Sequence, residues 1–281
     1  MMRKYLELVK FSHTIFALPF AVISMLAAAD GWPSGRILGW ILVAMVCART
    51  MAMTFNRIMD REIDALNPRT ATRPLVTGDI SMAQAWWLWG FTSLGFFLAA
   101  WSLNPLCLVL SPIVWLVLNG YSLSKRFTAW THLLLGLSLG LAPLGAWVAV
   151  TGRMDWHPIP LSLAVILWVA GFDIIYSLQD EDIDKKLGLN SIVVRYGAAG
   201  GLILSRIFHF LAVILFLWFG LIQDFGTIYF LGIAVVAATL VAEHHLVSPE
   251  DRSKINAAFF TANGIVSLVL LAATCLDLAL R

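Results

Sequence analysis

Nine apolar stretches, each roughly 17 to 23 residues long and bounded by glycine, proline or charge, constrain the fold of this 281-residue chain most strongly. Helices of this length cross the hydrocarbon core of a bilayer, which is about 30 Å thick. With 60% hydrophobic and 13% charged residues, the chain cannot form an ordinary water-soluble domain. The sequence therefore predicts an all-α, polytopic membrane protein, with one domain over residues 1–281. Its expected spans are residues 11–29, 36–55, 82–101, 105–123, 132–150, 158–178, 202–221, 225–243 and 255–277.

Lysine and arginine are distributed unequally between the two sides of these spans. Of the 19 basic residues, Arg36, Arg153 and Arg281 fall on one side, Arg49 lies inside a span, and the other 15 share the opposite side. Because basic residues accumulate in cytoplasmic loops, the basic side is predicted to face the cytoplasm, as in a multi-pass protein of the cell's inner (cytoplasmic) membrane. The net charge of +2 argues against nucleic acid as a ligand, and the sequence implies no protein partner.

Two acidic motifs lie on that predicted cytoplasmic side, each directly after an expected span. In the first, Asn56, Asp60 and Asp64 recur every four residues and would share one face of a continuing helix. Carboxylates so close to each other repel unless a cation lies between them. The second motif repeats the spacing 120 residues later, so that Asp60, Glu62 and Asp64 correspond to Asp180, Asp182 and Asp184.

An acidic run after a helix is usually a solvated cap, and a single DxxxD spacing is weak evidence for a metal site. Two copies on one membrane side favour cation binding. Mg²⁺ suits them, because it takes oxygen ligands and keeps positions for substrate phosphates. Basic residues in the nearby loops, which would not help to bind a bare cation, extend this interpretation to a diphosphate site with Mg²⁺. These residues are Arg69, Arg73, Lys125 and Arg126.

One charged residue lies inside the span before each motif. Arg49 precedes Asn56 by seven residues, and Asp173 precedes Asp180 by seven, which places each about two helical turns deeper. Charges at such a depth are costly, so we expect Arg49 and Asp173 to be partners across the bundle. The pair could be purely structural or could form the polar floor of a substrate pocket.

Four segments of the sequence resemble a known family in order and spacing. They are FSHTIFALPFA, RTMAMTFNRIMDREIDALNPRTATRPLVTG, GYSLSKRFT and FDIIYSLQDEDIDKKLGLNS, and together they cover nearly the whole chain. On these segments the chain resembles the UbiA superfamily of intramembrane prenyltransferases, within it the 4-hydroxybenzoate polyprenyltransferase-like branch. The resemblance implies nine transmembrane helices in a bundle around a central cavity, which opens toward the cytoplasmic caps and toward lipid.

The resemblance also implies roles for individual residues. Mg²⁺ bound to a polyprenyl diphosphate would be coordinated by Asn56, Asp60, Asp64, Asp180 and Asp184, of which the four aspartates are the catalytic set. The diphosphate would contact Tyr121 and Lys125 of a YxxxK motif, Arg69 and Arg73 of an RTxxRP element, and Lys10, which stands where an arginine is common. Arg49 and Asp173 match positions near the aromatic acceptor.

The implied reaction joins the prenyl group to an aromatic ring carbon and needs no nucleophilic side chain. The acceptor implied by the motifs is 4-hydroxybenzoate, for quinone biosynthesis, while a dihydroxynaphthoate of menaquinone biosynthesis would suit similar pocket chemistry. A base must remove the ring proton, and Asp60, Asp173, Asp184 and the diphosphate itself are all candidates. A cation-coupled transporter is the alternative of another class, because it too places carboxylates within a helix bundle.

Overall fold

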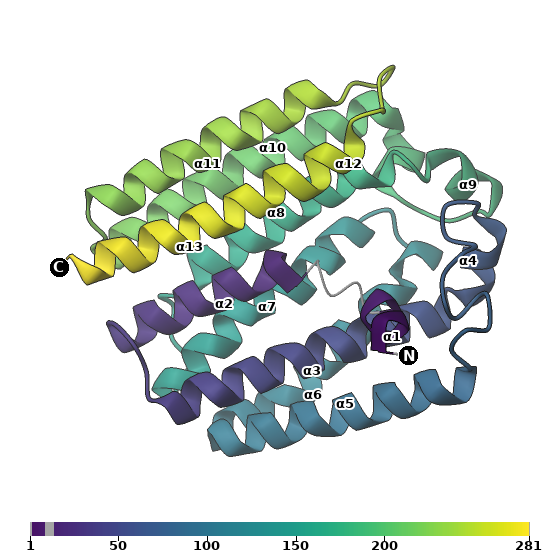
Figure 1. Ribbon diagram of the computed structural model, residues 1–281. Helices are drawn as coiled ribbons and strands as arrows, with labels where there is room; N and C mark the ends of the chain where they lie inside the picture. The colour runs from purple at the N-terminus through teal and green to yellow at the C-terminus, as the bar shows by residue number, and fades with distance from the viewer. Residues whose placement is uncertain (1, 9–13, 281) are drawn as a thin grey trace. The chain divides into compact units, whose positions relative to one another are not determined.

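The computed structural model describes residues 2–8 and 14–280, and helices account for most of them (Figure 1). The chain divides into two compact units. The first consists of Met1–Thr14 and Ser34–Ser124, and the second of Ile15–Pro33 and Lys125–Arg281. The two acidic motifs therefore belong to different units.

The first unit is built on α3 (Gly35–Met59), which packs against α5 (Met82–Leu103) and α6 (Pro105–Gly120). Local sequence sets where these helices begin. Ser81 and Gln84 form a reciprocal capping box at α5, and the Asn104 side chain caps α6 just before a proline suited to its first turn. The remaining elements are α1 (Met2–Leu8), α4 (Arg61–Leu66) and the beginning of the 3₁₀ helix η2 (Tyr121–Arg126).

The second unit is organised around α8 (Ile159–Ser177), which packs against both α7 (Thr131–Thr151) and α10 (Ile192–Ile222). Its core includes the fully buried Trp168 together with Phe20 of α2. In Figure 1, α11 and α13 run side by side along the same unit. Its other elements are α2 (Thr14–Ala29), α9 (Glu181–Lys186), α11 (Thr227–Leu246), α12 (Ile255–Ala257), the π-helical turn η3 (Ala258–Ala262) and α13 (Asn263–Ala279).

Small residues allow α7 and α8 to approach closely. Gly136 and Gly140 are four residues apart on α7, and a Cβ added at Gly136 would lie 2.3 Å from the backbone oxygen of Ile166. The Ser162 hydroxyl donates a hydrogen bond of 2.6 Å to the Gly140 carbonyl across the same contact. Glycine at this spacing promotes packing between membrane helices, where the hydrophobic effect gives no drive for helices to associate.

Within the described ranges, seven helical segments are long and apolar enough to cross a membrane. The protein is thus a multi-pass integral membrane protein, as predicted, and seven of the nine expected spans are confirmed. The other two, residues 11–29 and 82–101, correspond to α2 and α5, which are not among the seven. The apolar part of α2 covers only Leu18–Ala29, and residues 11–13 lie outside the described part of the chain.

We expect Gly136→Ala to lower the melting temperature of the detergent-solubilised protein, because its methyl group would overlap the Ile166 carbonyl. Overpacking of this kind costs about 1–3 kcal/mol. Gly145→Ala is the matched control on the same helix, since a Cβ there meets nothing within 4 Å. Equal melting temperatures for the two variants in a thermal-shift assay would contradict the close contact between α7 and α8.

Candidate active site

The first acidic motif joins the end of α3 to the start of α4. Backbone hydrogen bonds continue through the junction, from the Asp60 N–H to the Asn56 carbonyl (2.9 Å) and from the Asp64 N–H to the Asp60 carbonyl (2.7 Å). The four-residue spacing therefore places these side chains on successive turns, as predicted. The Asn56 amide nitrogen donates to Asp60 Oδ2 at 2.9 Å.

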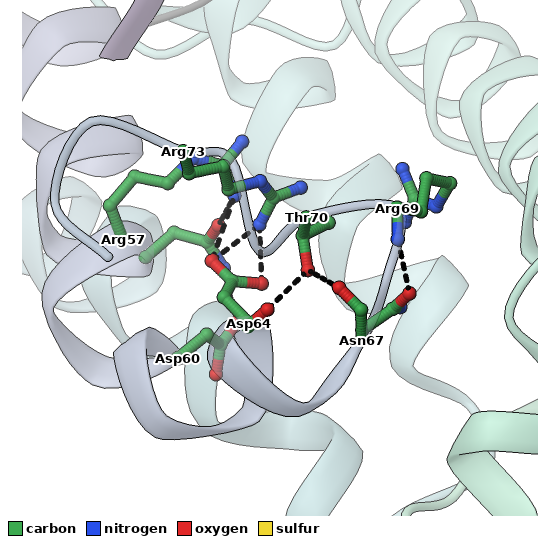
Figure 2. A network of polar contacts seen from close by, with 8 residues as sticks. Arg57, Asp60, Asp64, Asn67, Arg69, Thr70 and Arg73 are labelled. Carbon is green, nitrogen blue, oxygen red and sulfur yellow. Dashed lines mark hydrogen bonds and ion pairs between the residues drawn. The ribbon is translucent and has the colours of Figure 1, made fainter. Parts of the chain in front are cut away.

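Asp64 is buried, and arginines neutralise its charge (Figure 2). Arg73 Nη1 lies 2.5 Å from both carboxylate oxygens of Asp64, and Arg57 Nη1 lies 4.0 Å from Oδ2. The loop after α4 brings Arg73 back to this position, and the Thr70 hydroxyl holds the loop by donating to the Asp64 carbonyl at 2.9 Å. Arg57 also donates to Asn56 Oδ1 at 3.0 Å.

The second acidic motif has the same local geometry in the other unit. Asp180 precedes α9, and the Asp184 N–H donates to the Asp180 carbonyl at 2.8 Å. Both carboxylates are buried, whereas Asp182 is exposed. The spacing predicted that Asp182 shares the motif, but a two-residue offset turns its side chain away from Asp180 and Asp184 on a helix.

Lys125 neutralises the second motif. Its Nζ donates to Asp184 Oδ2 at 2.9 Å, and its backbone carbonyl accepts from the Asn190 N–H at 2.7 Å. Burial raises the pKa of Asp184, although Lys125 acts to lower it. Each unit thus holds one buried carboxylate of its motif against a base.

Asp173 of α8 has a partner that the sequence analysis missed. His132 Nδ1 of α7 lies 2.7 Å from Asp173 Oδ2, and the histidine is fully buried. A single histidine in an apolar stretch has no distinctive spacing, so only the contact between α7 and α8 reveals it. Arg57 was likewise missed, because one arginine at the end of a span is common.

The remaining predicted residues lie mainly in the first unit. Arg49 is on α3, and its buried Nε has no hydrogen-bond partner among the described residues. Tyr121 lies within electrostatic range of Arg49 and Asp60. Arg69 is exposed on the loop after α4. The approach of Arg49 to Asp173, and of one motif to the other, stays a prediction because these residues belong to different units.

Lys10, predicted to contact diphosphate, lies outside the described residues.

The donor chemistry of each motif fits Mg²⁺. Across the described ranges, no group of three or more His, Cys, Asp or Glu side chains is gathered so that it could hold a metal ion. Each motif instead presents carboxylates on successive turns, with an added amide in the first. Mg²⁺ is commonly held by one or two carboxylates together with waters and substrate phosphates, so a sparse oxygen set of this kind is sufficient.

Glu181, next to Asp180, connects α9 to the loop between α11 and α12. Its carboxylate accepts hydrogen bonds of 2.7 Å from both Lys185 Nζ and Arg252 Nη2. Arg252 also donates to the Leu178 carbonyl at 2.9 Å, just before the motif. Burial alone would raise the pKa of Glu181, but the two donors together hold it below its usual value.

Comparisons with known proteins place the chain in a family. The model of the UbiA prenyltransferase family matches residues 17–265. A 4-hydroxybenzoate octaprenyltransferase from Shewanella frigidimarina (strain NCIMB 400) is 30% identical over 98% of this chain and 97% of its own. A protein of the same name from Nitrosospira multiformis is also 30% identical, over 90% of this chain and 87% of its own.

Solved structures show the same fold. The apo structure of a UbiA homolog from Aeropyrum pernix K1 is 34% identical, with a TM-score of 0.86 over 94% of this chain and 98% of that one. A UbiA homolog from Archaeoglobus fulgidus bound to DMAPP and Mg²⁺ has a TM-score of 0.75 over 99% of this chain and 100% of that one, at 21% identity. The chain belongs to the UbiA prenyltransferase family. It is a membrane-embedded transferase of prenyl groups.

We expect Arg252→Gln to destabilise the protein by about 1–3 kcal/mol at neutral pH, because it removes a charged donor from a buried carboxylate. The pKa of Glu181 is lowered in the folded state, so the stabilisation is present at neutral pH and is lost as the pH falls through that lowered value. The difference in melting temperature between wild type and variant should therefore persist down to the ordinary glutamate pKa of about 4.3 and shrink as the pH falls below it.

Lys186→Gln, an exposed change on the same short helix, is the control and should leave the melting temperature unchanged. A difference between wild type and Arg252→Gln that is constant with pH would contradict the pairing of Arg252 with Glu181.

Proposed function

We propose that this prenyltransferase transfers a polyprenyl group from polyprenyl diphosphate to a ring carbon of 4-hydroxybenzoate, as a step of quinone biosynthesis. One observation carries the proposal: each acidic motif holds a buried carboxylate against a base, Asp64 with Arg73 and Asp184 with Lys125. Acids and bases gathered in this way suit an anionic ligand that arrives with a divalent cation. The names of relatives at 30% identity over nearly the full length support the choice of acceptor.

The acidic side chains would hold Mg²⁺. Its ligands would be Asn56, Asp60, Asp64, Asp180 and Asp184. When bound, Mg²⁺ supplies positive charge that stabilises the diphosphate as it departs.

The basic side chains would contact the diphosphate. Arg73 and Lys125 already face carboxylates, and a diphosphate would offer each a second, strongly charged acceptor. The full proposed set is Lys10, Arg69, Arg73, Tyr121 and Lys125. These contacts would strengthen as negative charge accumulates on the leaving group, which favours the transition state over the ground state.

The aromatic acceptor would be bound deeper in the spans. Arg49 has a buried Nε without a hydrogen-bond partner among the described residues, which suits the carboxylate of an aromatic acid. Asp173 lies at a similar depth below the second motif. Apolar surroundings would exclude water, which would otherwise capture the allylic cation that forms as the C–O bond breaks.

The proposal also includes nine membrane-spanning helices, with both acidic motifs on the cytoplasmic side. α5 carries no Asp, Glu, Lys or Arg, and its mean hydropathy is reduced by four tryptophans, Trp86, Trp87, Trp89 and Trp101. Tryptophan is typical of membrane interfaces, so α5 would cross the bilayer together with α2. All of residues 1–281 would then form one catalytic domain. A transporter is set aside, because the chain belongs to a family of prenyltransferases.

The substrate assignment is tested with purified protein in detergent, Mg²⁺, and geranyl or farnesyl diphosphate. We expect a prenylated product with 4-hydroxybenzoate, its loss on addition of EDTA, and its return with excess Mg²⁺. A dihydroxynaphthoate is offered in parallel. If only the dihydroxynaphthoate gives a product, it replaces 4-hydroxybenzoate as the proposed acceptor. Activity that persists in EDTA would contradict the dependence on Mg²⁺.

Substitution of the motif aspartates tests the site. We expect Asp60→Asn and Asp180→Asn each to lower kcat/KM by about 10²-fold or more, because each removes a charge that the diphosphate complex requires. Glu62→Gln and Asp182→Asn are matched controls, since both acids are exposed on the same short segments. Full activity in both aspartate variants, or equal losses in variants and controls, would refute the assigned site.

A further inference from the structure

The contact between His132 and Asp173 joins α7 to α8 and takes no part in the metal or diphosphate sites proposed above. His132 Nδ1 lies 2.7 Å from Asp173 Oδ2. The imidazole is fully buried, while the side chain of Asp173 is 23% exposed. Both residues belong to the second unit, as do Lys125, Asp180 and Asp184.

The contact determines which ring nitrogen of His132 carries the proton. An ionised carboxylate only accepts hydrogen bonds, so the Nδ1 facing Asp173 must be the protonated nitrogen. In a neutral imidazole, Nε2 then keeps its lone pair. A carboxylate that fixes this tautomer also stabilises the imidazolium that forms when Nε2 takes up a proton.

Nε2 is also the nitrogen that the fold leaves unused. It is buried and has no hydrogen-bond partner among the described residues. A buried polar group left unsatisfied is costly to the fold, which calls for a functional explanation. Asp173, the partner of His132, lies on α8 seven residues before Asp180, about two helical turns from the second motif. His132 Nε2 therefore lies on the side of the second unit that carries the proposed diphosphate-binding residues.

We infer that His132 is the base that removes the ring proton of the acceptor and that Asp173 positions it. The inference rests on the proposed function. As the allylic C–O bond breaks, the diphosphate departs with the electron pair, and a ring carbon forms the new C–C bond. The C–H bond at that carbon then breaks, its electron pair restores the aromatic ring, and the proton passes to Nε2. The imidazolium gives up the proton again after the product leaves, which regenerates the base.

The test compares 4-hydroxybenzoate with the same acid deuterated at the ring positions beside the hydroxyl. In His132→Gln we expect kcat to fall by about 10²- to 10⁴-fold. The deuterium isotope effect on kcat should rise above the wild-type value, because breaking the C–H bond becomes limiting. A packing defect lowers the rates of both isotopic forms equally and leaves their ratio unchanged.

Asp173→Asn is the second variant and decides the question if His132→Gln does not fold. An asparagine that donates its amide N–H to Nδ1 would move the imidazole proton to Nε2 and remove the base, so the isotope effect should again rise. An isotope ratio equal to that of the wild type in the folded variant, or an unchanged kcat, overturns the inference.

His157→Gln is the matched control. His157 Nδ1 also contacts an aspartate, Asp155 Oδ1 at 2.5 Å, but this pair follows the far end of α7, about 30 Å along the helix from His132. The kcat and the isotope effect should stay at wild-type values in this variant, and a rise there would overturn the inference. A wild-type enzyme that does not prenylate 4-hydroxybenzoate refutes the proposed function alone, and the comparison then uses the deuterated form of the aromatic acid that it does prenylate.

Discussion

A buried carboxylate must have a positive or hydrogen-bonding partner, and the polar part of this protein is arranged around that requirement. A charge taken out of water is costly unless it is paired, and the cost is greatest inside a bilayer. Three buried carboxylates near the acidic motifs have basic side-chain partners whose nitrogens lie 4.0 Å or less from a carboxylate oxygen. The pairs are Asp64 with Arg73 and Arg57, Asp184 with Lys125, and Glu181 with Arg252 and Lys185.

The two units satisfy this requirement with the same local geometry but with bases from different parts of the chain. In each unit a short helix continues the span through an acid, and a second acid follows one turn later. Arg73 follows Asp64 by nine residues on an adjoining loop, whereas Lys125 precedes Asp184 by 59 residues. Both units therefore pair a buried acid with a base, but the base comes from a different part of the chain in each. A base so placed balances the acids in the absence of a ligand, and in the proposed function it would also contact the diphosphate.

Close helix packing positions the deeper polar residues. The glycines of α7 allow α8 to approach within contact of its backbone, and the same pair of helices brings His132 to Asp173. The proposed reaction would benefit from such rigidity, because a base displaced by about 1 Å would lose much of its effect.

The amino-acid sequence by itself determined the class of fold, seven of the spans and the spacing of both motifs, because hydrophobic length and helical periodicity are local properties. It also led to the family, through motifs that can be read along the chain. Only the tertiary structure decided which base meets which acid, that Asp182 faces solvent while Asp184 is buried, and that Asp173 pairs with His132. These contacts join residues up to 71 positions apart, as in Arg252 with Glu181, and they depend on how helices pack in three dimensions, which no local pattern records.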